Sequence, residues 1–185
     1  MNLLHFKVDS ELSLIFEHPS LAEAYLALRN DNLEYLKRWI PWAERSDTLD
    51  DFEAFIKRSL HNYAEGKGMS FGIAYQGEIV GNIALQGISE KRRKASLGYW
   101  LAEDAQGQGI VSRACCFLID YAFTQLNLTK IQIEVASDNQ ASRKVCERLG
   151  MKLEGIITQA GNVGDRIEDH AIYGLHREPS EIRHG

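Results

Sequence analysis

The sequence has little that would divide the chain or place it in a membrane. Its 185 residues include three prolines and no Pro/Ser-rich stretch, so we expect one domain with a core over about residues 11–176. No apolar run approaches the roughly 18 residues of a membrane span, and the N-terminus carries charges where a signal peptide would be apolar. The sequence therefore predicts a single-domain cytoplasmic protein with no membrane partner.

Cysteines and metal-ligand patterns are also scarce. The three cysteines, Cys115, Cys116 and Cys146, form no CxxC pair, which predicts reduced, buried thiols. The six histidines show no HxH or HxxxH spacing, so we expect no metal site. With 26 acidic and 21 basic residues, the net charge is −5. A negative charge disfavours direct nucleic-acid binding and suits basic or amine-bearing partners.

Hydrophobic periodicity predicts alternating strands and helices. A meander of three strands precedes a β-α-β-α-β unit, which predicts an α/β domain with a mixed sheet of about seven strands and helices on both faces. We expect strands over residues 12–17, 69–75, 78–86, 95–101, 130–136, 151–159 and 166–176. We expect helices from Pro19, over 33–39, from Thr48 to Gly66, from Ile110, and from Asp138 or Asn139 to Gly150.

A glycine-rich turn joins the strand over 95–101 to the helix that begins at Ile110. The turn reads Gln106-Gly107-Gln108-Gly109, and glycines let backbone N–H groups approach a ligand closely. The free N–H groups of a helix start favour a phosphate or pyrophosphate, although a plain tight turn is the alternative. A dinucleotide site would need glycine or alanine where Ser112 stands and a βαβ start upstream. A dinucleotide is therefore the less favoured of the phosphate ligands that this turn can bind.

Three blocks of the sequence resemble GCN5-related N-acetyltransferases (GNAT). The segment Gln106 to Val111 matches the family signature Q/R-x-x-G-x-G/A except at Val111, and Asn139-Gln140-Ala141-Ser142 matches the second element, Asn-x-x-Ser. With Leu149 to Gly155, these blocks look most like the branch that acetylates the N-termini of ribosomal proteins. The resemblance extends over about residues 11–175. It implies a sheet that opens between the fourth and fifth of the predicted strands, and acetyl-coenzyme A as co-substrate.

The resemblance also implies the parts of the coenzyme A site. The pantetheine arm would pair with the backbone of the fourth predicted strand, where an N–H near Tyr99 would polarise the thioester carbonyl. The pyrophosphate would bind the amides of the helix start. Asn139 would hold the pantetheine arm, and Ser142 would steady the departing thiolate. The predicted cofactor-binding residues are Trp100, Leu101, Ala102, Gln106, Gly107, Gln108, Gly109, Ile110, Val111, Ser112, Arg113, Asn139 and Ser142.

The sequence does not single out the group that removes the proton of the amine. Relatives often carry a carboxylate at the positions of Ser96 and Gly161. The remaining candidates are Glu134, Asp169, His170 and the acidic loop over residues 43–48. An ordinary ion pair is the alternative role for Glu134, and a structural hydrogen bond is the alternative for Asp169. An α-amine, with a pKa of about 7.7–8.0, is already partly neutral at pH 7. We therefore expect no single strong base, and a water held by Glu134 instead.

The acceptor is expected to be the α-amine of a protein, in particular of a ribosomal protein. The loop over residues 38–48 carries aromatic and acidic side chains, which suit a cationic N-terminus. Two alternatives stay open: a small-amine acetyltransferase acting on a polyamine or an amino sugar, and a catalytically silent coenzyme A sensor. The oligomeric state also stays open, a homo-oligomer included. The predicted catalytic residues are Ser142, Glu134 and Tyr99, and the predicted substrate-side residues are Trp42, Glu44 and Asp169.

Overall fold

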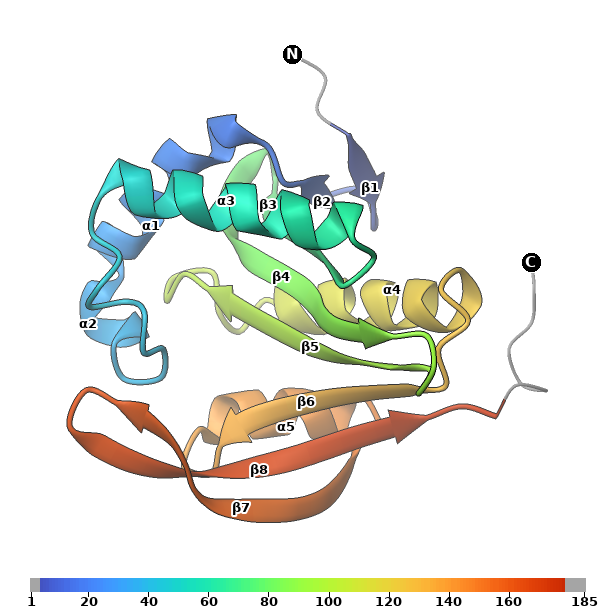
Figure 1. Ribbon diagram of the computed structural model, residues 1–185. Coiled ribbons are helices and arrows are strands. Elements are labelled where there is room, and N and C mark those ends of the chain that lie inside the picture. The colour runs from blue at the N-terminus through green and yellow to red at the C-terminus, as the bar shows by residue number, and fades with distance from the viewer. Residues whose placement is uncertain (1–3, 179–185) are drawn as a thin grey trace.

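The computed structural model describes residues 4–178, which form one mixed β-sheet flanked by helices (Figure 1). The sheet has eight strands in the order β1-β2-β3-β4-β5-β6-β8-β7. The strands are β1 (His5–Lys7), β2 (Leu12–Phe16), β3 (Gly68–Tyr75), β4 (Glu78–Ser89), β5 (Lys94–Leu101), β6 (Lys130–Ala136), β7 (Lys152–Val163) and β8 (Arg166–His176). The helices are the 3₁₀ turn η1 (Pro19–Leu21), α1 (Ala22–Asp31), α2 (Leu33–Leu36), α3 (Leu49–Ala64), α4 (Ile110–Thr124) and α5 (Gln140–Arg148).

This is the predicted single-domain α/β architecture, with one strand more than expected. The extra strand, β1, is three residues long and pairs antiparallel with β2. Three residues are too few to show the alternation by which a strand is recognised in a sequence. The helix expected over 33–39 is also shorter, because after Leu36 the chain forms turns in which Arg38 and Trp39 donate to carbonyls three residues back.

Side-chain caps set where two of the helices begin. Thr48 and Asp51 form a capping box at the start of α3, in which each side chain accepts the other residue's backbone N–H. The Thr48 hydroxyl also donates to the Asp51 carboxylate at 2.6 Å, and this bond lowers the pKa of Asp51. At α5, Asn139 Oδ1 accepts from the Ser142 N–H at 3.1 Å. The predicted starts of both helices are confirmed, with Asn139 rather than Asp138 as the cap.

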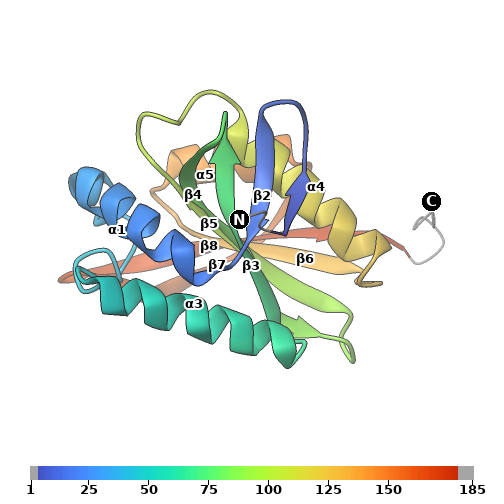
Figure 2. The same cartoon turned by 90° about the horizontal axis from the view of Figure 1, so that it is seen from above.

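The two faces of the sheet carry different side chains. α4 and α5 cover one face, and α1 and α3 cover the other (Figure 2). Toward α4, alternate positions of β3–β5 are large and apolar, and they form the main core. Toward α1 and α3, most of the intervening positions are small or polar, including Ser70, Gly72, Asn82, Ala84 and Gly98, whereas Trp100 is large. Because small side chains fill less of the space beneath the helices, a cavity can form on that face.

β5 and β6 are parallel neighbours that separate along their length. They pair only at Lys94–Lys130, Ala95–Ile131 and Ser96–Gln132, near the start of both strands. Beyond these positions β5 continues to Leu101 and β6 to Ala136 without pairing. The predicted opening between the fourth and fifth expected strands is therefore confirmed, and these strands are β5 and β6.

The β7–β8 hairpin spans the open end of the sheet, and its turn lies beside the segment that follows α2 (Figure 1). There Arg166 Nη2 donates to the carbonyl of Arg38 at 2.5 Å. A register shift bends β7 near Gln159, whose backbone N–H donates to Asp169 Oδ1 at 2.9 Å. The hairpin thus joins the last strands to the loop that the sequence assigned to the acceptor.

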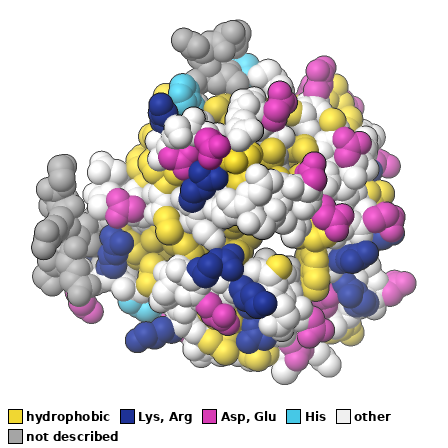
Figure 3. All heavy atoms as spheres, turned by 180° about the vertical axis from the view of Figure 1, so that it is seen from behind, with side chains coloured by type: hydrophobic (Ala, Val, Ile, Leu, Met, Phe, Trp, Pro, Cys, Tyr) yellow, Lys and Arg dark blue, Asp and Glu magenta, His cyan; other side chains and the backbone are white. Residues whose placement is uncertain are grey.

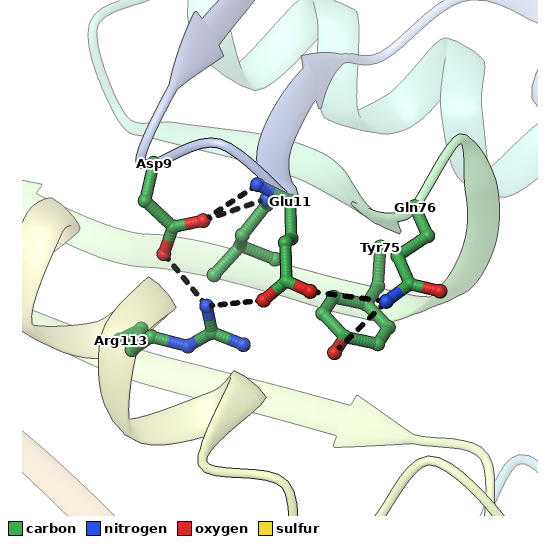
Figure 4. A network of polar contacts seen from close by, with 6 residues as sticks. Asp9, Glu11, Tyr75, Gln76 and Arg113 are labelled. Atoms are coloured by element: carbon green, nitrogen blue, oxygen red, sulfur yellow. Dashed lines mark hydrogen bonds and ion pairs between the residues drawn. The ribbon is translucent and has the colours of Figure 1, made fainter.

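Arg113 ties α4 to the turn between β1 and β2 (Figure 4). Its Nη1 lies 2.8 Å from Asp9 Oδ2 and 3.6 Å from Glu11 Oε2. Glu11 also accepts from the side chain of Gln76, in the turn between β3 and β4, at 3.0 Å. The Arg113 guanidinium is therefore paired with carboxylates at the N-terminal edge of the sheet.

The cysteines are unpaired, but they are not all buried. Cys115 and Cys146 are buried, whereas Cys116 is exposed, contrary to the prediction. Successive residues of a helix point in directions about 100° apart, so Cys115 faces the core while its neighbour faces solvent. Burial raises the pKa of Cys146 to about 12. The two buried thiols are therefore protonated near neutral pH.

The surface carries charges of both signs. On the face seen from behind, acidic and basic side chains are interspersed (Figure 3). Within residues 4–178, no helix is long and apolar enough to cross a membrane. In the same part of the chain, no group of three or more His, Cys, Asp or Glu side chains is placed to hold a metal ion.

Candidate active site

A cavity of about 570 Å³ lies where β5 and β6 separate. Gly98 to Leu101 of β5 form one wall and Ile133 to Ala136 of β6 form the other. The glycine turn and the start of α4 close one side, while α5 contributes Ser142 and Arg148. We call this space the thioester cavity, because the sequence predicts a coenzyme A thioester there.

The glycine turn has the backbone geometry that a phosphate site requires. Gly107 and Gly109 have φ angles of 74° and 71°, a left-handed conformation that other residues adopt at a cost of roughly 1–2 kcal/mol. A Cβ added at either position would meet no atom within 4 Å. The amides of Ile110, Val111 and Ser112 open α4, where a helix has no internal acceptors for its N–H groups. The turn therefore presents an uncovered set of donors.

Two buried polar atoms beside the cavity have no hydrogen-bond partner in the described structure: Tyr99 Oη and Gln106 Nε2. Both residues line the thioester cavity. Burial raises the pKa of Tyr99, while the neighbouring Ser142 hydroxyl lowers it, with burial the larger effect. The Tyr99 hydroxyl therefore stays protonated and can donate. Buried donors left without partners are costly, so the cavity suits a ligand with polar acceptors.

Asn139 and Ser142 stand on the α5 side of the cavity. Capping uses Asn139 Oδ1, which leaves the Nδ2 group of the amide free to donate to a ligand. Ser142 lies one turn into α5 and borders the cavity near Tyr99. The Asn-x-x-Ser element thus combines a helix cap with two polar groups aimed at one space.

The predicted cofactor-binding residues divide into two groups. Ten of them border the thioester cavity: Trp100, Leu101, Gln106, Gly107, Gly109, Ile110, Val111, Ser112, Asn139 and Ser142. Ala102, Gln108 and Arg113 do not. The Ala102 N–H donates to the Val80 carbonyl, the Gln108 side chain donates to the Asp104 carbonyl at 3.3 Å, and Arg113 is paired with Asp9.

A second cavity, of about 790 Å³, lies between the sheet and α3. It borders α3 at Phe52, Phe55 and Arg58, and it shares Ile40 and Gly98 to Trp100 with the thioester cavity. A Cβ added at Gly98 would meet nothing within 4 Å. We call this space the acceptor cavity. The two cavities therefore meet at the same three residues of β5.

A buried carboxylate, Glu17, lies behind the wall of the acceptor cavity and was missed by sequence reasoning. Glu17 is 3% exposed, and its Oε1 accepts from Asn82 at 2.8 Å, Ser70 at 2.9 Å and Tyr25 at 3.1 Å. Burial raises the pKa of Glu17, while these hydrogen bonds lower it. Its other oxygen has no partner within the described residues. The only signal in the sequence is polar Ser70 and Asn82 within otherwise apolar strands.

The three predicted substrate-side residues lie in different places. Trp42 lines the acceptor cavity and packs edge-on against Trp100, with ring centroids 5.6 Å apart. Glu44 is exposed and lies beside Gly164 in the β7–β8 turn, outside both cavities. Asp169 is exposed and holds the bulge of β7.

Glu134 and His170 meet across the β6–β8 pair at the edge of the thioester cavity. His170 Nδ1 lies 2.6 Å from Glu134 Oε1. The side chain of His170 is 21% exposed and that of Glu134 is 45% exposed, so neither is fully buried in the core. The structure therefore joins Glu134 and His170, two of the candidate bases, and leaves Asp169 apart from them.

Comparison with known proteins agrees with this geometry. Residues 13–152 match the family model described as an acetyltransferase (GNAT) domain. The chain is 34% identical over 170 residues to the putative ribosomal N-acetyltransferase YdaF of Bacillus subtilis, covering 91% of this chain and 93% of that protein. It is 30% identical over 142 residues to the ribosomal-protein-serine acetyltransferase of Escherichia coli, covering 77% and 79%.

A solved structure shares the fold over almost the whole chain. The ribosomal L7/L12 α-N-protein acetyltransferase RimL, in complex with coenzyme A, superposes with a TM-score of 0.90 at 25% identity and covers 94% of this chain and 98% of its own. The family model alone spans most of the chain, and the relatives extend the match beyond it. Together with the opened sheet and the glycine turn, these matches show that the chain belongs to the GNAT acetyltransferase family.

Proposed function

We propose that this acetyl-coenzyme A-dependent N-acetyltransferase acts on the N-terminal α-amine of a protein, with ribosomal proteins as the first acceptors to test. The observation that carries the proposal is the meeting of two cavities at Gly98, Tyr99 and Trp100. A ligand in each cavity reaches the same stretch of β5 from opposite sides. That arrangement allows an amine to attack a thioester directly. Action in the cytoplasm belongs to the same proposal.

The residues of the thioester cavity fit coenzyme A. Acetyl-coenzyme A supplies an activated acetyl group as a thioester. The amides at the start of α4 would bind its pyrophosphate, and Asn139 Nδ2 would donate to the pantetheine arm. A backbone N–H of β5 near Tyr99 would stabilise charge on the carbonyl oxygen. Ser142 and the unpaired Tyr99 hydroxyl would donate to the departing sulfur.

The lining of the acceptor cavity favours a peptide over a polyamine. Its charged residues are Asp51, Arg58 and Lys67, and Asp51 is already engaged by Thr48. A polyamine carries several positive charges and would need several free carboxylates nearby. The aromatic rings of Trp42 and Trp100 and the neutral polar side chains suit an extended peptide instead. The names of the two curated relatives point to the same acceptor class.

A competition between acceptors tests the proposal. The protein is incubated with acetyl-coenzyme A and one of three amines, and free thiol is measured. The amines are a short peptide with a free N-terminus, the same peptide N-terminally blocked but containing lysine, and spermidine. We expect turnover mainly with the free N-terminus, because the α-amine is partly neutral at pH 7 whereas a lysine amine, with a pKa of about 10.4, is not.

Two other outcomes would favour the alternative functions. Turnover of spermidine alone would replace the proposed acceptor with a small amine. Coenzyme A binding without turnover of any amine in a pool of ribosomal proteins would support the silent sensor. Mass spectrometry of the acetylated peptide then identifies the nitrogen that carries the acetyl group.

A further inference from the structure

The hydrogen bond between His170 and Glu134 determines which ring nitrogen of His170 carries a hydrogen and which can accept a proton. A carboxylate oxygen only accepts hydrogen bonds, so the 2.6 Å contact requires a hydrogen on His170 Nδ1. In neutral imidazole the other ring nitrogen, Nε2, then carries a lone pair. Glu134 therefore holds His170 in the tautomer that can take up a proton at Nε2.

Gly161 lies against the Cε1–Nε2 edge of the ring and has no side chain that would displace it. A Cβ at position 161 would lie 2.7 Å from His170 Cε1 and 2.8 Å from Nε2, closer than side-chain atoms approach one another. Gly161 does not have a positive φ, so its backbone does not require glycine. The lack of a side chain is therefore explained by the histidine ring that occupies this space. No hydrogen bond to His170 Nε2 is found among residues 4–178.

His170 also borders the cavity in which the thioester would lie. It lines the thioester cavity together with Gly98 to Trp100, where the two cavities meet. The other titratable or charged groups that border this cavity are Tyr35, Tyr99, Glu134 and Arg148. Asp169, the neighbour of His170 on β8, is bound to the Gln159 N–H instead. Apart from the Glu134–His170 pair, the described lining of this cavity holds no carboxylate and no second imidazole.

We propose that His170 is the general base of the acetyl transfer and that Glu134 is its positioning residue. This inference rests on the proposed function, and it replaces the expectation from the sequence that no single strong base exists. In the step, the amine nitrogen forms a bond to the acetyl carbon and the carbon–sulfur bond breaks. The proton of the amine passes through one water molecule to His170 Nε2, and the sulfur leaves as the thiolate of coenzyme A.

Substitutions at the pair test both roles. His170→Gln keeps a polar side chain that can still reach Glu134 but removes the base. We expect kcat/KM for the peptide to fall about 100-fold, within the range for general-base catalysis, with coenzyme A affinity within threefold of wild type. Glu134→Gln keeps the shape and removes the charge, and should lower kcat/KM about tenfold. In wild type the pH profile should show an acid limb that belongs to the His170–Glu134 pair.

The acid limb of the pH profile of kcat/KM distinguishes a catalytic base from a histidine with only a structural role. It should be absent in His170→Gln, whereas the ionisation of the acceptor amine should remain. A limb that persists unchanged in His170→Gln would belong to the amine and would overturn the inference. So would a variant that binds coenzyme A and keeps kcat/KM within threefold of wild type.

A glycine pair tests the geometry without touching either residue of the dyad. Gly161→Ala should displace the ring and lower kcat about tenfold. Gly155→Ala, on the same strand, adds a Cβ that meets nothing within 4 Å and should leave kcat unchanged. In the His170→Ala background Gly161→Ala should cost nothing further, because the ring it would displace is gone. An equal loss in both backgrounds would overturn the role of Gly161.

Nitrogen NMR of the imidazole supplies a readout that does not depend on turnover. We expect the Nδ1–H tautomer of His170 in wild type and a mixed population in Glu134→Gln. An Nε2–H tautomer in wild type would overturn the inference. Coenzyme A binding without turnover of any amine by wild type would remove the proposed function together with this inference. Turnover by His170→Gln within threefold of wild type would remove the inference alone.

Discussion

The thioester cavity and the acceptor cavity share β5 but are built in different ways. The thioester cavity draws on local motifs: a glycine turn, a helix start and the capped start of α5. The acceptor cavity is assembled from α1, α3, β3, β4 and the loop after α2, which meet only in the folded chain. On one side of this strand, short segments therefore specify the glycine turn and the helix starts, whereas the other side depends on long-range packing alone.

On the proposed function, the coenzyme A site would be general and the acceptor site would be selective. A phosphate needs backbone donors at a helix start, which any chain with suitable glycines can supply. An acceptor would be distinguished by side chains such as Trp42, which packs edge-on against Trp100 and Phe52. We therefore expect substitutions in the glycine turn to weaken coenzyme A binding strongly. Substitutions in the acceptor cavity should change affinity for the amine or the stability of the fold.

The largest expected effect is at the glycine turn. Gly109→Glu places a side chain and a negative charge where the phosphate would bind, and Gly109 has a φ of 71°. We expect coenzyme A affinity to fall more than 100-fold by calorimetric titration. Gly66→Glu is the matched control, because Gly66 has a φ of 67° but lines neither cavity. Equal losses in both variants would mean that backbone strain, not the phosphate site, causes the effect.

The next largest effect concerns the fold beneath the acceptor cavity. Glu17→Leu leaves the donors of Asn82, Ser70 and Tyr25 without their shared acceptor. We expect the free energy of unfolding to fall by about 3 kcal/mol in urea titration. The exposed Glu53→Leu should change it by less than about 0.5 kcal/mol. A small effect at Glu17 would show that this network is not a structural support of the cavity.

The charge of Glu17 adds a dependence on pH. Because burial raises the pKa of Glu17 above its ordinary value of 4.5, folding favours the protonated carboxyl. The stability from this group is present below pH 4.5 and is lost as the pH rises through the raised pKa. Wild type should therefore lose stability relative to Glu17→Gln as the pH is raised from 4.5 to neutral. A pH-independent difference between the two melting temperatures would contradict this.

Ser142→Ala should have a smaller effect, confined to the chemical step. If Ser142 donates to the departing sulfur, kcat should fall about tenfold while coenzyme A affinity stays within a few-fold. Tyr99→Phe is a useful companion, because the Tyr99 hydroxyl has no partner within the described residues. The pair of variants tells which hydroxyl assists the sulfur. An unchanged kcat in Ser142→Ala would leave Ser142 as a helix residue beside the cofactor.

The smallest effect is expected at Trp42. Trp42→Ala removes one aromatic wall of the acceptor cavity, so KM for the peptide should rise about fivefold while KM for acetyl-coenzyme A stays the same. Trp42→Phe keeps a ring against Trp100 and should restore most of the affinity. Steady-state kinetics with each substrate varied in turn measures both constants. A parallel rise in both KM values would mean that the two cavities are not independent.

Local sequence determined much of the fold and of the coenzyme A side. The Thr48 and Asn139 caps, the glycine turn and the alternating strands each depend on neighbours within about four residues, so the chain alone indicates them. The opening of the sheet between β5 and β6 followed from the family resemblance and is present. The strand β1 was not predictable, because three residues carry no period and are held only by pairing with β2.

Only the tertiary structure decided what surrounds the acceptor. Glu17 is separated from Ser70 and Asn82 by more than 50 residues, and no local pattern records that they meet. In the same way Gly161 reads in the sequence as a missing carboxylate, whereas in the fold it makes room for the ring of His170. A periodic pattern reports which face of an element is buried. It does not report which side chains meet across elements. Those contacts depend on the strand register and on the path of the β7–β8 hairpin, and the packing of the whole chain determines both.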